Sequence, residues 1–196
     1  LFIGKTHKFK NLLNLMTLDK WDSILTYKQI EPYLSQIRVF VPNKRKYYIE
    51  TLYSHYEHTH YIEQLDVTKD IITEKYPDYV DAYNQVMNQR YGYMFNMMIM
   101  EKELVDEYCT WLFDILFELK NRLNMPELSS FQGRFYGRVS ELIFNVWLTH
   151  QIQNGRIKQS QIKELDCIHM ENINWWKKGL AFLKAKFFGK RYEGSF

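Results

Sequence analysis

The segment from Phe131 to Trp147 constrains the fold most, because its apolar side chains recur at the period of an α-helix. The apolar face contains Phe131, Phe135, Val139, Leu142, Ile143, Val146 and Trp147. Spacing of this kind is typical of an amphipathic helix that buries one side against a core. We therefore expect a long helix here, with other elements packed against its apolar face.

A polar stripe runs beside that face. It consists of Arg134, Arg138, Glu141 and Asn145. Two guanidinium groups one turn apart can bind a diphosphate, while a carboxylate and an amide beside them can position a hydroxyl group. The alternative is a solvent-exposed face with an internal arginine–glutamate ion pair, and the residues alone favour that alternative.

A third stripe of the same segment has almost no side chains. It contains Gly133, Gly137 and Ser140. Glycine inside a helix costs roughly 1 kcal/mol relative to alanine. This cost predicts that another element or a ligand approaches the helix closely at the stripe.

Composition indicates one soluble globular domain over residues 1–196, with 46% hydrophobic and 25% charged residues. The aromatic content of 17% is high. Aromatic rings fill a core by default, but they also supply stacking surfaces for sugars, bases or partner proteins. A net charge of +3 is too small to indicate nucleic acid, so we expect no nucleic-acid partner.

Residues 172–196 form a basic, aromatic C-terminal segment. Such a segment can lie on an anionic membrane surface, or it can be a helix that docks its aromatic side and solvates its lysines. Cys109 and Cys167 are the two cysteines, which suggests a reducing compartment. With no secretory signal and no apolar run that could cross a bilayer, we expect a cytoplasmic protein with at most peripheral membrane contact.

Helical and strand-like patterns alternate along the chain, which predicts an α/β fold. Besides the helix described above, we expect helices over 26–36, 62–75, 79–89 and 102–123, and strands over 37–41, 93–100 and 165–170. The strand over 93–100 should be central and buried, because its apolar run is continuous. Three strands make a thin sheet for so many helices, so further strands are expected before Leu1.

Three histidines crowd into the segment 47–61, together with two glutamates and five tyrosines. A structural zinc site needs four ligands at recognisable spacing, and both cysteines lie far away in the sequence. We therefore interpret His55, His58 and His60 as part of a polar, aromatic surface where one histidine acts on a ligand or a proton. A dedicated metal site there is the less favoured alternative.

Asn96 interrupts the apolar run 93–100. A buried amide must find hydrogen-bond partners, so Asn96 either pins a neighbouring loop or contacts a ligand. The chain contains no P-loop, no GxGxxG, no GxSxG, no paired CxxC and no DxD-like acidic pair after a strand. Common nucleotide and hydrolase motifs therefore do not identify its chemistry.

Four ordered blocks of the chain resemble a known family. They are KRKYYIETLYSHYEHTHYIEQLD, MFNMMIMEKELVDEYCTWLFDILFEL, FQGRFYGRVSELIFNVWL and IHMENINWWKKGLAFLKAKFFGKRY. Together they resemble bacterial capsular-polysaccharide glycosyltransferases, a family long filed as a domain of unknown function that includes galactofuranosyltransferases of O-antigen synthesis. The likeness runs from Trp21 to the last residue. The family's N-terminal part, with an HYRRY-like signature, has no counterpart here.

The resemblance implies a helix-rich GT-A-like α/β fold whose first nucleotide-binding strands are missing from this chain. It places Asn96 on the strand beneath the sugar, Gln132 in a later element and His169 at a late position that binds metal in similar enzymes. The sequence departs from that pattern, with methionines in place of the strand's glycine and Phe131-Gln132-Gly133 in place of D-Q-D. His169 is therefore a weak candidate ligand for a Mn²⁺ or Mg²⁺ cofactor.

The resemblance also assigns roles to the polar stripe. Glycosyl transfer needs a cationic partner for the departing diphosphate and, if configuration inverts, a carboxylate base. Arg134 and Arg138 suit the first role. Glu141 suits the second, with Glu171 as the next candidate.

The expected reaction moves a hexose or galactofuranose from a UDP-sugar donor to a lipid-linked polysaccharide intermediate in capsule or O-antigen synthesis. His55 and His58 are expected to recognise the donor or the acceptor. The alternative is a non-catalytic helical module that binds a partner protein or an anionic membrane surface. Convergence of Arg134, Arg138, Glu141 and His55 at the strand ends would favour the enzyme.

Overall fold

The computed structural model describes residues 2–4, 20–123, 128–130 and 132–168, and it confirms the expected α/β class. The helices are α1 (Tyr27–Ile30), α2 (Leu52–Thr59), α3 (Glu63–Lys75), α4 (Val80–Met87), α5 (Lys102–Arg122) and α6 (Phe135–Gln153). The strands are β1 (Phe2–Gly4), β2 (Val39–Pro42), β3 (Arg45–Lys46), β4 (Tyr91–Gly92), β5 (Ile99–Met100) and β6 (Ile162–Ile168). A 3₁₀ turn, η6 (Gln132–Arg134), leads directly into α6.

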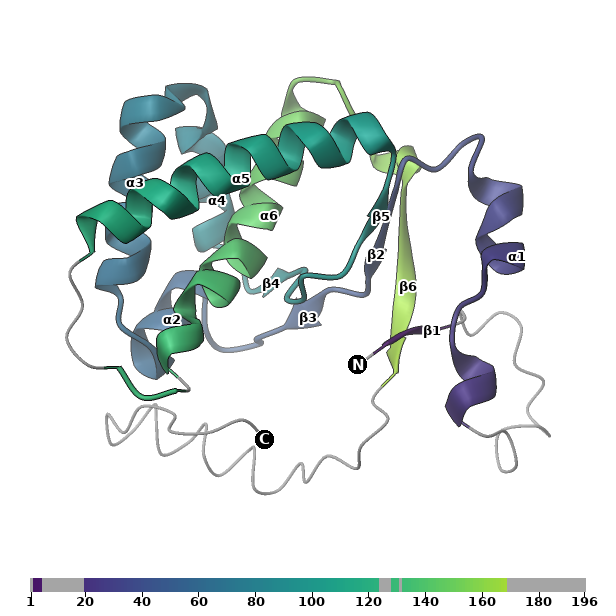
Figure 1. Ribbon diagram of the computed structural model, residues 1–196, viewed down its shortest axis with the longest axis horizontal. Helices are drawn as coiled ribbons and strands as arrows, with labels where there is room; N and C mark the ends of the chain where they lie inside the picture. The colour runs from purple at the N-terminus through teal and green to yellow at the C-terminus, as the bar shows by residue number, and fades with distance from the viewer. Residues whose placement is uncertain (1, 5–19, 124–127, 131, 169–196) are drawn as a thin grey trace.

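The main sheet is mixed, with strand order β1-β6-β2-β5 (Figure 1). β2 and β6 run parallel, with Val39 opposite Ile162 and Pro42 opposite Leu165. The outer strands β1 and β5 are antiparallel to their neighbours. A separate two-stranded ribbon pairs β3 with β4 just beyond the carboxyl end of β2.

Helices α2 to α6 gather on one side of the sheet and enclose the main core, whereas α1 lies on the other side (Figure 1). α5 packs against α3 and α6, and α4 packs against α6. The apolar face of α6 is buried as expected, and Trp147 and Ile143 are completely enclosed. In the described part of the chain, none of the helices has the length and apolar character needed to cross a membrane.

β2 contributes to two cores because successive side chains of a strand point to opposite faces. Val39 and Val41 belong to the main core. Phe40 lies in a smaller cluster with Ile30 and Leu165 on the other face. A single strand therefore connects the two apolar clusters.

Most expected elements are confirmed with shifts of a few residues, but the strand over 93–100 is wrong. Only Ile99–Met100 is a strand, and it lies half-buried at the edge of the sheet. The preceding residues bend across α6, because the side chains of Asn145 and Ser140 on that helix hydrogen-bond to Tyr93 and Asn96. The helix expected over 26–36 is also shorter, since α1 ends at Ile30 and Pro32 enters a 3₁₀ turn.

Candidate functional site

Glu141, in the N-terminal half of α6, is a half-buried carboxyl group with cationic neighbours. Burial raises its pKa to about 7, and the positive charges of Arg138, Arg134 and Arg45 only partly offset this effect. Arg134 and Arg138 lie on the same face of the helix as Glu141, as the spacing predicts. A carboxyl group that is about half ionised at neutral pH is well matched to general base catalysis.

Tyr47 connects this carboxyl group with α2. The guanidinium carbon of Arg45 lies 4.9 Å from the centre of the Tyr47 ring, and the imidazole of His55 lies 4.3 Å from it, centre to centre. Burial raises the pKa of Tyr47, Arg45 lowers it, and the negative charges of Glu141 and Glu50 raise it further. We define the Glu141 cluster as Arg45, Tyr47, Glu50, His55, Arg134, Arg138 and Glu141.

Glu50 is only 3% exposed and holds two histidines in place. Its Oε2 atom lies 2.9 Å from Nδ1 of His55, and its Oε1 atom lies 2.8 Å from Nδ1 of His58. Burial lowers the pKa of His55, whereas the hydrogen bond to Glu50 raises it. A carboxylate can only accept hydrogen bonds, so Nδ1 of each ring is the donor in its contact with Glu50.

Thr51 fixes where α2 begins, and therefore where these histidines lie. It is the N-cap residue, and its Oγ1 accepts a hydrogen bond from the backbone N–H of Ser54 at 3.1 Å. His55 and His58 follow three residues apart on the helix, so they face the same side. Glu50, just before the cap, can therefore reach both rings.

Gln132 joins the end of α2 to the start of α6. Its side chain is buried, and Oε1 lies 3.2 Å from Nδ1 of His60. The amide nitrogen donates to the backbone oxygen of Thr59 at 3.5 Å. This tether sets the position of Arg134 relative to α2, while a direct contact of Gln132 with substrate stays a prediction.

Asn96 is exposed, so its expected burial is wrong, but it does pin the loop 93–98 to α6. Its amide nitrogen donates to the backbone oxygen of Gly137 at 2.9 Å, and its oxygen accepts from the Ser140 hydroxyl at 2.9 Å. The loop therefore approaches the small-residue stripe at Gly137 and Ser140, whereas no described atom approaches Gly133. A Cβ at Gly137 would lie 4.0 Å from Asn96, an ordinary contact, and one at Gly133 would meet none of these atoms within 4 Å.

Asn145 does not face the site, although it lies on the same stripe of α6 as Glu141. It is buried, and its oxygen accepts from the backbone N–H of Tyr93 at 2.7 Å. Its amide nitrogen donates to the backbone oxygen of Tyr93 at 2.9 Å. Asn145 therefore positions the backbone beside β4.

The structure brings together Arg134, Arg138, Glu141 and His55 beyond the carboxyl end of β2, where ligands bind in α/β sheets. Sequence reasoning gave no role at the site to Arg45, Tyr47 or Glu50. Their placement depends on the β3–β4 ribbon, which pairs residues far apart in the sequence. The dense histidines around Glu50 were the one local signal of its importance.

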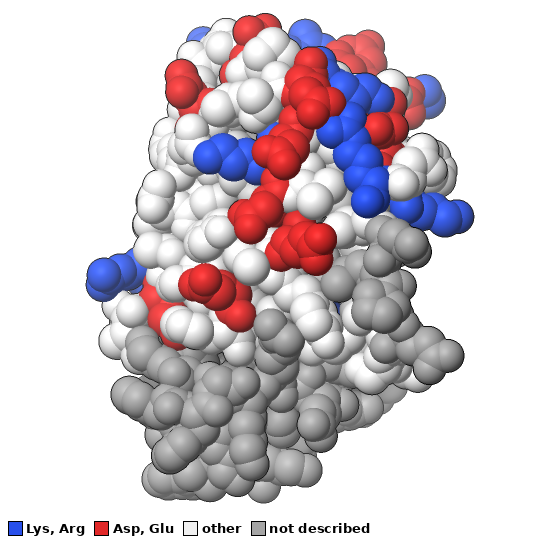
Figure 2. Space-filling model, turned by 90° about the vertical axis from the view of Figure 1, so that its left-hand side faces the viewer, with Lys and Arg blue, Asp and Glu red and all other residues white. Residues whose placement is uncertain are grey.

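The surface around α3 carries many acidic side chains, in contrast to the arginine-rich surroundings of Glu141. Figure 2 shows acidic side chains gathered into a band on this side. Exposed carboxylates of α3 recur at helical spacing at Glu63, Asp66, Asp70 and Glu74. Lys and Arg side chains lie beside this band (Figure 2), and Arg122 forms an ion pair with Glu74 at 2.7 Å.

No group of three histidine, cysteine or carboxylate side chains within the described ranges is arranged to hold a metal ion. His169 and Glu171, and the basic segment 172–196, lie outside the residues that the structure describes. Among the residues that the structure describes, no ligand set for Mn²⁺ or Mg²⁺ is therefore found, and the cofactor stays a prediction.

The fold and site define a class of protein: an α/β protein that places a half-buried carboxyl group of raised pKa among three arginines. Residues 2–153 match the family described as Domain of unknown function (DUF4422), and the chain belongs to that family. No curated protein matches the chain.

Among solved structures, the chain is similar to the apo structure of the WbbM bifunctional glycosyltransferase. The two share 28% sequence identity, with a TM-score of 0.66. The match covers 71% of this chain and 25% of that one, so the chain corresponds to about a quarter of that protein. This likeness relates the chain to glycosyltransferases at the level of family and fold.

Proposed function

We propose that this protein is a glycosyltransferase that transfers a hexose or galactofuranose from a UDP-sugar. The acceptor is a lipid-linked polysaccharide intermediate at the cytoplasmic face of the membrane. The observation that carries the proposal is the Glu141 carboxyl group, with a pKa of about 7, among Arg45, Arg134 and Arg138. The likeness to a glycosyltransferase gives this chemistry its reaction class.

In the proposed reaction, Glu141 removes the proton from an acceptor hydroxyl group. The acceptor oxygen forms a bond to the anomeric carbon while the bond from that carbon to the UDP oxygen breaks. The electron pair of the broken bond leaves on the diphosphate, and the proton remains on Glu141. A single displacement of this kind inverts the configuration of the sugar.

The arginines act on the leaving group. Arg134 and Arg138 each present guanidinium donors that match the geometry of phosphate oxygens. Negative charge builds up on the diphosphate as the glycosidic bond breaks, so cations held in place stabilise the transition state more than the ground state. Arg45 adds a third positive charge from the ribbon.

The histidines and Asn96 recognise sugar hydroxyl groups. Glu50 holds His55 and His58 in one orientation, and this reduces the entropy lost when a substrate is bound. Asn96 is exposed beside Gly137 and so is accessible to a substrate.

The test is UDP release by the full-length protein with a panel of UDP-hexoses that includes UDP-galactofuranose. We expect release with one donor. Glu141→Gln and Arg138→Ala should each lower the rate about a hundredfold, because each removes a base or a charge needed in the transition state. The rate of the unaltered protein should rise with pH through about 7, as Glu141 ionises.

Matched controls are Glu103→Gln and Lys120→Ala, which change exposed side chains of α5 away from the cluster. Both should keep the original rate. A folded protein that binds no UDP-sugar would overturn the proposal and favour the non-catalytic module. Full activity in Glu141→Gln would remove Glu141 from its role as the base.

A further inference from the structure

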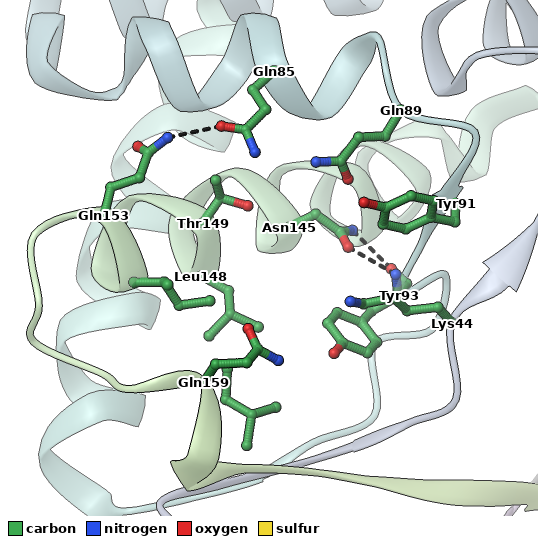
Figure 3. A pocket seen from close by; sticks show the side chains of 12 residues that line it. Lys44, Gln85, Gln89, Tyr91, Tyr93, Asn145, Leu148, Thr149, Gln153 and Gln159 are labelled. Carbon is green, nitrogen blue, oxygen red and sulfur yellow. Dashed lines mark hydrogen bonds between the residues drawn. The ribbon is translucent and has the colours of Figure 1, made fainter.

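A hollow lies beside the C-terminal half of α6 and close to β4. It has a volume of about 210 Å³. Pockets for drug-sized ligands have about 300–1,000 Å³, so this hollow fits a ligand about as large as one sugar ring. Figure 3 shows that its side chains come from α4, β4, α6 and the segment after α6.

The lining is rich in neutral hydrogen-bonding groups. Gln89, Thr149 and Gln159 point toward the middle of the hollow (Figure 3). Among the residues that the structure describes, these three side chains form no hydrogen bond. Amides and hydroxyls both donate and accept, as do the hydroxyl groups of a sugar.

The charge of the hollow is already balanced. Lys44 is its one charged lining residue among those described. Its Nζ atom lies 3.7 Å from Oε1 of Glu164 and 5.3 and 5.0 Å from the ring centres of Tyr91 and Tyr93. A carboxylate and two aromatic rings therefore offset the ammonium charge, which favours an uncharged ligand over an anionic one.

Tyr91 supplies an aromatic surface at the same place. Its side chain is 43% exposed, an unusual degree for a large ring beside a hollow. The C–H groups of a sugar face carry partial positive charge, and the face of an aromatic ring is partly negative. One ring with several neutral donors and acceptors around it is thus suited to a sugar.

The hollow is separate from the Glu141 cluster, because the two lie on opposite faces of the ribbon. Lys44 contacts the tyrosines of the hollow, whereas Arg45, the next residue, contacts Tyr47. Along α6, Glu141 and Thr149 are separated by about 12 Å of helix rise. Asn145, the lining residue nearest to Glu141 in sequence, is about 6 Å of helix rise from it, so the hollow lies beside the proposed reaction site and not at it.

We propose that the hollow binds one uncharged sugar unit. We assign this sugar to the saccharide acceptor, as a unit that lies away from the end of the acceptor that reacts. This assignment rests on the proposed function. Binding of the sugar itself follows from the lining alone. The site retains an acceptor chain without taking part in bond formation.

The experiment titrates methyl glycosides of galactose, glucose and mannose into the full-length protein and follows binding by NMR. We expect binding of one of them in the millimolar range. Gln89→Ala and Tyr91→Ala should each weaken binding roughly fivefold or more, as the loss of one hydrogen bond or stacking contact implies. The anionic probe methyl glucuronide should bind no better than methyl glucoside.

Gln36→Ala and Tyr48→Ala are matched controls, because both residues are exposed outside the hollow and Tyr48 is 79% exposed. They should bind glycosides as the unaltered protein does. UDP-sugar binding should survive both hollow variants, which separates this proposal from the proposed function. Absence of glycoside binding, or binding unchanged in Gln89→Ala and Tyr91→Ala, would overturn the proposal.

Discussion

At the scale of single residues, burial and neighbouring charges have opposite effects on the pKa of the Glu141 carboxyl group. Burial favours its neutral form, and three arginines favour its ionised form. Burial is the larger effect, so the pKa lies at about 7 instead of the ordinary 4.5. The carboxyl group can therefore accept a proton at neutral pH, and it carries a stability cost when it ionises.

This cost predicts a pH dependence of stability. The pKa of Glu141 is higher in the folded state than in the unfolded state, so its contribution is fully present below about 4.5 and is lost as pH rises through about 7. We expect Glu141→Gln to gain about 1–3 kcal/mol in unfolding free energy, relative to the unaltered protein, between pH 4.5 and pH 8. Urea unfolding of both proteins at several pH values across this range measures the difference in unfolding free energy.

Glu103→Gln is the control, because Glu103 is exposed at the start of α5. Its unfolding free energy should follow that of the unaltered protein at every pH. If the curve for Glu141→Gln also stays parallel to that of the unaltered protein, Glu141 does not have the raised pKa described here.

The residues of the site differ in how far sequence could find them. Arg138 and Glu141 lie on α6, Arg134 lies in the 3₁₀ turn that leads directly into it, and helical spacing predicts all three on one face. Arg45 lies in β3, which pairs with β4 more than forty residues later in the chain. No local pattern encodes that pairing.

At the scale of elements, Asn145 takes the place of a neighbouring strand for the backbone of Tyr93. The side-chain amide forms both a donor and an acceptor bond, at 2.9 and 2.7 Å. The sequence placed Asn145 on the polar stripe correctly, but the continuous apolar run 93–100 indicated a strand. Asn145 of α6 bonds the backbone N–H and C=O of Tyr93, which a neighbouring strand would otherwise bond. The periodicity of residues 93–100 does not reveal this competition.

We expect Asn145→Ala to lower the free energy of unfolding by about 2–4 kcal/mol. The substitution leaves a buried N–H and a buried C=O of Tyr93 without a partner, at about 1–3 kcal/mol each. Denaturant unfolding measures the loss.

Asn121→Ala removes an exposed asparagine near the end of α5 and serves as the control. It should change stability by no more than about 0.5 kcal/mol. Equal stability of the two variants would show that the ribbon does not depend on Asn145.

At the scale of the whole molecule, β2 connects two apolar clusters that would otherwise be independent. Val39 and Val41 face the helices, and Phe40 faces the cluster with Ile30 and Leu165. The sequence predicted a single domain over 1–196. A shared central strand predicts in addition that the described part of the chain unfolds in one step.

We expect Phe40→Ala to lower stability by about 3–5 kcal/mol, because the buried ring leaves a cavity. Thermal unfolding followed by far-UV and near-UV circular dichroism should still give one coincident transition. Phe113→Ala, at a 49% exposed position, should have a much smaller effect. Two separate transitions in the unaltered protein would show that the clusters are independent.

The contact between Asn145 and Tyr93 also affects how the protein behaves at high concentration. Unpaired backbone groups at a strand edge are a template for another chain, and this is a common route to aggregation. Because the N–H and C=O of Tyr93 are already bonded to Asn145, an incoming strand finds no partner at this residue. The amide that shapes the ribbon and the burial of Tyr93 thus together close this end of β4 to intermolecular β-pairing.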